Sequence, residues 1–78
     1  MAEQVTRAEG YKIWRNPADR QGGPVFMGSY YPPRGHLCFY QADLQDLGFP
    51  PGSYTIRVPD SVCQRYALPQ WQAIELPE

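Results

Sequence analysis

The chain has 78 residues, seven of them basic and eight acidic, so its formal net charge is -1. This length holds a single domain, 1–78, and the near-neutral charge excludes a strong overall attraction to nucleic acid or to anionic membranes. Nine prolines and seven glycines, together with 42% hydrophobic residues, indicate an ordered domain rich in turns rather than a disordered chain.

The sequence contains no targeting or membrane signal that we can identify. It has no run of 18 apolar residues, and its first ten residues lack the apolar stretch of a signal peptide. We therefore expect a cytoplasmic protein with no membrane partner. Thiols stay reduced in that compartment, so we expect Cys38 and Cys63 to be free and mostly buried.

The first elements of the chain are a strand and a loop. Residues 1–9 are expected to form a flexible N-terminus. The alternation of side chains in 10–16 predicts a strand that places Ile13 and Trp14 on opposite faces. Residues 16–23 are rich in Pro, Asp, Asn and Gly, which predicts a mobile loop.

Two aromatic and apolar runs follow, at 24–31 and 36–41, and each is typical of a strand. The four-residue linker between them places Pro33 at the second position and Gly35 at the fourth position of a type I turn. We therefore predict a hairpin. Gly28 inside its first arm indicates a β-bulge or a close approach of two backbones.

The second half alternates short helices and strands. Residues 42–48 predict a helix capped by Asp43, and residues 60–68 predict a second helix. The alternation in 53–59, which sets Ile56 opposite Thr55 and Arg57, is the clearest strand pattern in the chain, and 71–77 predicts a last strand.

These elements predict a mainly β, β-rich α+β fold. About five short, mostly antiparallel strands form a curled sheet or partial barrel with two short helices. A compact α+β sheet with both helices on one face is the alternative. The strand at 71–77 is expected at an edge, where pairing with a second copy would give a homodimer.

We identify no catalytic, metal or cofactor site. His36, Cys38 and Cys63 are too few for a structural zinc site, which uses four ligands. The same residues lack a third orienting group for nucleophilic catalysis, and Asp43 with Asp46 is typical of a helix start rather than of an acid–base pair. The sequence therefore favours a binding protein that is not an enzyme and has no cofactor.

Exposed Tyr and Arg side chains carry much of the binding energy in protein interfaces. The predicted hairpin brings such residues together, and we expect it to bind an unidentified protein partner. The candidate partner-binding residues are Tyr30, Tyr31, Arg34, His36, Arg15 and Arg20.

Two other interpretations remain open. The same side chains would stack on the bases of single-stranded nucleic acid, although such binders usually carry a net positive groove. The segment "YYPPRG" would also serve as a polyproline ligand. The size and composition are similar to those of small accessory or inhibitory proteins of phages and mobile elements, an analogy that implies no fold.

Overall fold

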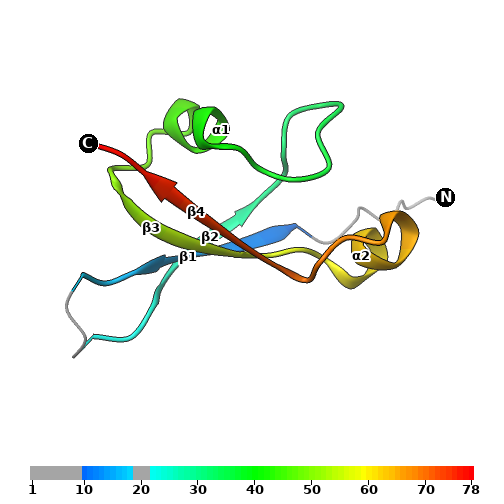
Figure 1. The fold of residues 1–78 in the computed structure, drawn as a ribbon, viewed down its shortest axis with the longest axis horizontal. Helices are drawn as coiled ribbons and strands as arrows, with labels where there is room; N and C mark the ends of the chain where they lie inside the picture. Colours follow the sequence, from blue (N-terminus) through cyan, green and yellow to red (C-terminus); the bar gives the residue numbers. More distant parts are fainter. Residues whose placement is uncertain (1–9, 19–21) are drawn as a thin grey trace, which may run out of the picture.

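The structure, a computed structural model, describes residues 10–18 and 22–78. The flexible N-terminus expected at 1–9 lies outside the described residues, as does the middle of the loop expected at 16–23. Four antiparallel strands form one sheet in the order β2-β1-β3-β4, and two short helices accompany it (Figure 1). In chain order the elements are β1 (Tyr11–Asn16), β2 (Val25–Tyr30), α1 (Gln41–Asp46), β3 (Gly52–Arg57), α2 (Asp60–Tyr66) and β4 (Trp71–Leu76).

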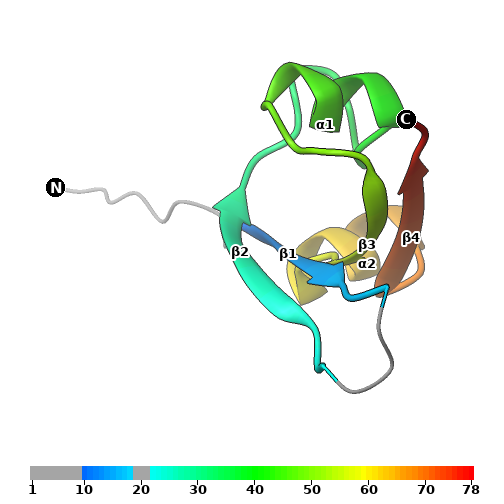
Figure 2. The same cartoon turned by 90° about the vertical axis from the view of Figure 1, so that its left-hand side faces the viewer.

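The sheet is curved but not closed. Its strands bend around the core, and α1 lies across the open side of this curve (Figure 2). β2 and β4 are the two edges and do not pair with each other. Mainly β architecture with two short helices is therefore confirmed, whereas the partial barrel is not.

The predicted fifth strand at 36–41 is wrong, and so is the hairpin that contained it. β2 instead forms its hairpin with β1, and residues 31–40 form an irregular loop. The turn in this loop begins at Pro33, whose carbonyl accepts from the His36 N–H at 2.9 Å. The Phe39 N–H and C=O are bound by the side-chain amide of Gln72 in β4, so this backbone is satisfied without a neighbouring strand.

The β-bulge indicated by Gly28 is confirmed. Ile13 pairs with Gly28 and the next residue, Trp14, pairs with Phe26, so Met27 is the extra residue on β2. Gly28 has a φ of 124°, a backbone angle that residues other than glycine rarely adopt. The bulge changes which residues of β2 share a face with Trp14.

The hydrophobic core lies between the inner face of the sheet and the two helices. Tyr11 and Phe39 meet edge to face in it, with ring centroids 5.5 Å apart. Val62 and Cys63 of α2 pack against the same core, which also contains Leu44 of α1. Its buried members are Tyr11, Ile13, Phe39, Leu44, Tyr54, Ile56, Val58, Ile74 and Leu76.

The start of α1 differs slightly from the prediction. Tyr40, not Asp43, occupies the N-cap position, and Asp43 is the third helical residue. The Asp43 carboxylate reaches back and accepts from the Tyr40 N–H at 2.9 Å, as the third residue of a capping box does. Asp43 therefore caps the helix from inside its first turn.

Candidate functional site

The outer face of the sheet carries side chains that strand pairing arranges in rows. Ile13 and Ile56 are buried on the inner face, so their neighbours in sequence point outward. The central row is Phe26, Trp14, Thr55 and Ala73; one flanking row contains Lys12, Arg57 and Trp71, and the other contains Asn16, Ser53 and Glu75.

Three aromatic rings meet on this outer face, and we call Trp14, Phe26 and Trp71 the aromatic face. The Trp14 ring centroid lies 5.5 Å from that of Phe26 and 6.0 Å from that of Trp71. Phe26 and Trp71 each remain 53% exposed. Both described helices contact the inner core, and neither covers these rings. The aromatic face is therefore a contiguous exposed patch, unlike exposed apolar residues that occur singly.

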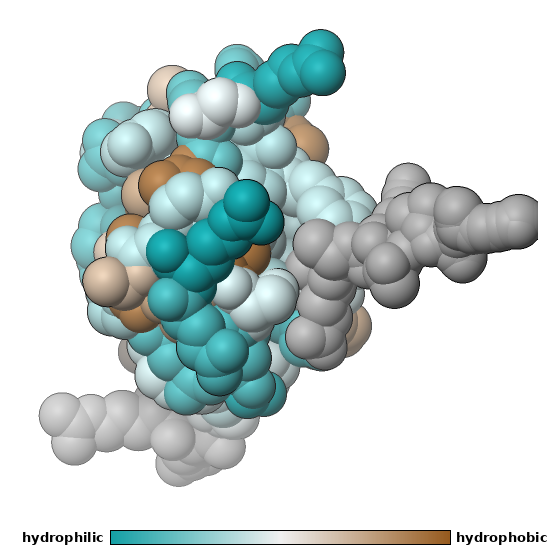
Figure 3. All heavy atoms as spheres, turned by 90° about the vertical axis from the view of Figure 1, so that its right-hand side faces the viewer, coloured by the Kyte–Doolittle hydropathy of each residue, from teal (hydrophilic) through white to brown (hydrophobic). Residues whose placement is uncertain are grey.

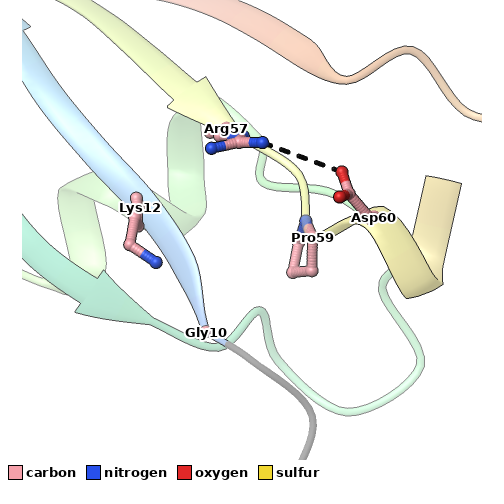
Figure 4. A pocket seen from close by; sticks show the side chains of 5 residues that line it. All are labelled: Gly10, Lys12, Arg57, Pro59 and Asp60. Atoms are coloured by element: carbon pink, nitrogen blue, oxygen red, sulfur yellow. Dashed lines mark ion pairs between the residues drawn. The ribbon is translucent and has the colours of Figure 1, made fainter.

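Cationic side chains flank the aromatic face on one side. Arg57 lies with its Cζ 5.9 Å from the ring centroid of Trp71, a distance at which a cation interacts with a ring. Its Nη2 is 3.8 Å from the Asp60 carboxylate, and Lys12 lines the same small hollow (Figure 4). Both side chains of this ion pair are exposed to solvent, so the pair stabilises the fold little. The Arg57 guanidinium therefore remains accessible to a ligand.

Polar side chains flank the other side. Asn16 Nδ2 donates to Thr55 Oγ1 at 2.9 Å and lies 3.4 Å from Ser53 Oγ. Glu75 occupies the same row on β4 and is exposed. The face thus runs from cations at one end, across aromatic rings, to hydroxyls, an amide and a carboxylate at the other.

The structure does not gather the residues that the sequence singled out. Tyr30 packs against the core, with its ring 5.3 Å from Phe49, and its hydroxyl donates to the Met27 carbonyl at 3.2 Å. Tyr30 pairs with Tyr11 at the start of β1, whereas Arg15 lies near the end of that strand. The Arg15 side chain donates to the Pro51 carbonyl at 3.2 Å.

Three of the other predicted site residues, Tyr31, Arg34 and His36, belong to the loop 31–40. Tyr31 and Arg34 are exposed there, and Tyr31 lines a hollow next to α1. His36 is engaged within the fold, because its Nδ1 lies 3.1 Å from Asp43 Oδ2 and its ring contacts that of Tyr40. Arg20 lies outside the described residues.

Several polar groups of β1, of the loop 31–40 and of α2 interact within the fold. A hydrogen bond with the Cys38 side chain is the main cause that raises the pKa of Tyr40, and burial raises the pKa of Tyr11. The Cys63 thiol faces the carbonyls of Val58 and Pro69. Within residues 10–18 and 22–78 no three His, Cys, Asp or Glu side chains converge, so we identify no group there that would hold a metal ion.

Seen from the end that carries α2, the surface is mainly hydrophilic with small hydrophobic areas (Figure 3). In the described part of the chain neither helix is long and apolar enough to cross a membrane.

Sequence patterns alone missed the aromatic face. They indicated that Trp14 lies opposite Ile13, and that Thr55 and Arg57 alternate with buried residues. The missing information was the strand register, which brings Phe26 and Trp71 to Trp14.

No protein-family model matches this chain, and neither a curated protein nor a solved structure is significantly similar to it. The function must therefore be inferred from the residues and their geometry.

Proposed function

We propose that this protein is a small binding module that recognises another protein through the aromatic face, acting as an inhibitor or an accessory subunit of that partner. The observation that carries the proposal is the contact of Trp14, Phe26 and Trp71 on a sheet face that no described helix covers. Trp and Arg are enriched among the residues that dominate protein interfaces, and Arg57 borders these rings.

The anatomy of this face also resembles that of a protein interface. Exposed aromatic rings occupy the centre, and polar or charged side chains surround them, as in a hydrophobic interface core with a polar rim. The rings stand on strands that are paired within the sheet, so binding orders less backbone than it would on a loop. Tyr31 and Arg34 remain a second, more isolated candidate contact on the loop 31–40.

The test compares affinity capture of partners from a nuclease-treated extract by the wild type and by Phe26→Ala/Trp71→Ala. Tyr66→Ala is the matched control, because this exposed aromatic residue lies on α2 and outside the aromatic face. We expect the double variant to fold and to lose about 2–4 kcal/mol of affinity for the captured protein, whereas the control keeps it. Equal capture by all three proteins would refute the assignment of the site.

Single-stranded nucleic acid is the second candidate ligand, because Arg57 and Lys12 stand beside rings on which bases would stack. Phosphate neutralisation makes such binding fall steeply with added salt, whereas an apolar protein contact responds weakly. Titration of a labelled oligonucleotide at low and moderate salt separates the two candidates, and binding that resists salt would count against nucleic acid.

A further inference from the structure

The two indole rings of the aromatic face form the walls of a shallow trough. Trp14 and Trp71 are tilted by 46° to one another, and Asn16, Pro24 and Thr55 complete the lining of a hollow of about 200 Å³. Pockets for small molecules usually measure about 300–1,000 Å³. The trough is therefore of a size to receive one or two side chains of a larger partner.

The hydrogen-bonding groups that line this trough are two indole N–H groups, the Thr55 hydroxyl and the Asn16 amide. An indole N–H only donates, so Trp14 and Trp71 each bring a donor and no acceptor to the trough. The Thr55 hydroxyl accepts from Asn16, which leaves its own proton able to donate. The Asn16 Oδ1 remains an acceptor, so a complementary ligand offers acceptors to the indole N–H groups and at most a donor to this amide oxygen.

An extended proline-rich segment has these properties. Proline has no N–H, and the polyproline II conformation makes no internal hydrogen bonds, so its carbonyl oxygens stay available. The carbonyls of an α-helix are already used within the helix. An added β-strand would extend the sheet sideways from edge strand β2 or β4 and would not lie on the face between Trp14 and Trp71. Proline rings also pack well against aromatic walls.

The charges around the trough indicate which way a bound segment would be oriented. Lys12 and Arg57 stand at one end, and Glu75 stands in the row at the other end. The Asp60 carboxylate lies 3.8 Å from Arg57 Nη2, which leaves two cations against one anion at the first end among the described residues. A phosphate backbone would need cations along its whole path, but on the described strands this face carries its cations, Lys12 and Arg57, at one end, on a chain of net charge -1. The distribution favours a segment with an acidic residue at one end.

We propose that the trough between Trp14 and Trp71 binds an extended, proline-containing segment of a partner protein, with an acidic residue of that segment beside Lys12 and Arg57. This inference rests on the proposed function and specifies its ligand. The carbonyl oxygens of the segment accept from the indole N–H groups, and a proline ring occupies the space between the two indoles.

The chain offers its own reporter for this ligand, because Trp14 and Trp71 are its two tryptophans. A ¹⁵N-labelled sample therefore gives two indole N–H resonances in an NMR spectrum. The probes are a short synthetic peptide with several prolines and two glutamates at one end, the same peptide with alanine in place of proline, and one with lysine in place of glutamate. We expect the first peptide to shift both indole resonances, the alanine peptide to shift neither, and the lysine peptide to bind several-fold more weakly.

Two variants test the contacts themselves. Trp71→Phe keeps an aromatic wall but removes an N–H, and we expect about a tenfold loss of affinity for the acidic proline peptide. Arg57→Glu should reverse the preference between the acidic and basic peptides. Arg65→Glu is its matched control, because it makes the same charge change on α2, and it should leave the preference unchanged.

Three results would overturn the inference. The first is unshifted indole resonances with every proline peptide at millimolar concentration. The second is a larger shift with an oligothymidylate that disappears with added salt, which would favour nucleic acid. The third is a shift that depends on protein concentration without peptide, which would identify a second copy of the chain as the occupant. If the proline peptides fail while partner capture still depends on Phe26 and Trp71, the proposed function stands and only the ligand class is wrong.

Discussion

Replacing Asp43 by alanine should destabilise the fold more than any other change of an acidic side chain on α1. Asp43 is 8% exposed, and its Oδ2 accepts from the Tyr40 N–H at 2.9 Å and faces His36 Nδ1 at 3.1 Å. A single carboxylate oxygen therefore joins the loop 31–40 to the start of the helix. The next residue, Leu44, is completely buried in the core, so loosening this junction also disturbs the packing of the helix.

The expected loss follows from the two contacts. Loss of a capping hydrogen bond costs about 1 kcal/mol. The contact with His36 contributes about another 1 kcal/mol, which is below the range of about 1.5–3 kcal/mol for hydrogen bonds to charged groups because His36 is partly exposed to solvent. The free energy of unfolding should then fall by about 2 kcal/mol. With a denaturant slope near 1 kcal/mol per molar urea for a chain this small, the unfolding midpoint should move by about 2 M.

Urea unfolding followed by tryptophan fluorescence measures this change. Asp43→Asn keeps a carbonyl oxygen as acceptor for the Tyr40 N–H and should lose about half as much stability. Asp46→Ala is the matched control: Asp46 is exposed at the last position of the same helix, where a negative charge is unfavourable. Its removal should be neutral or slightly stabilising. Equal losses for Asp43→Ala and Asp46→Ala would refute the role assigned to the buried carboxylate.

Three further changes test other parts of the fold. Gly28→Ala should cost about 1–3 kcal/mol in urea unfolding, because φ is 124° and the added Cβ would lie 3.2 Å from a ring carbon of Tyr30, whereas Gly23→Ala meets no atom within 4 Å and should cost nothing. Burial raises the pKa of Tyr11 above 10.0, so the folded state keeps this proton to higher pH than the unfolded chain; the free energy of unfolding should fall as the pH rises above 10, and Tyr11→Phe should flatten that fall when unfolding is compared at neutral and alkaline pH. Gln41→Ala exposes a carbonyl of edge strand β4 that the Gln41 side chain binds at 2.7 Å, so sedimentation should show more self-association; an unchanged mass would contradict this role of the side chain.

The strands that were predicted correctly carry their signal locally. In β1 the alternation placed Ile13 opposite Trp14, and in β3 it placed Ile56 opposite Arg57; the structure buries both isoleucines. A period of two is a property of a few consecutive residues, so no knowledge of the partner strand is needed to detect it. The bulge at Gly28 was visible for the same reason, because glycine in a strand is a local anomaly.

The error at 36–41 has a long-range cause. The run HLCFYQ has the aromatic and apolar composition of a strand, and Phe39 is indeed completely buried. Its backbone, however, pairs with the side chain of Gln72, which lies 33 residues further along the chain. No local pattern distinguishes a strand from a loop whose backbone is satisfied by a distant amide, so composition predicted a strand that does not form.

The candidate site depends on strand register in a way that composition does not reveal. Phe26 meets Trp14 because the extra residue Met27 shifts the pairing after Gly28. Since neighbouring residues in a strand point to opposite faces, removing this bulge would turn Phe26 away from Trp14. The bulge in edge strand β2 therefore determines that Phe26 belongs to the aromatic face. It follows that a variant which straightens β2 without unfolding the chain should weaken ligand binding, even though it changes no residue of the trough itself.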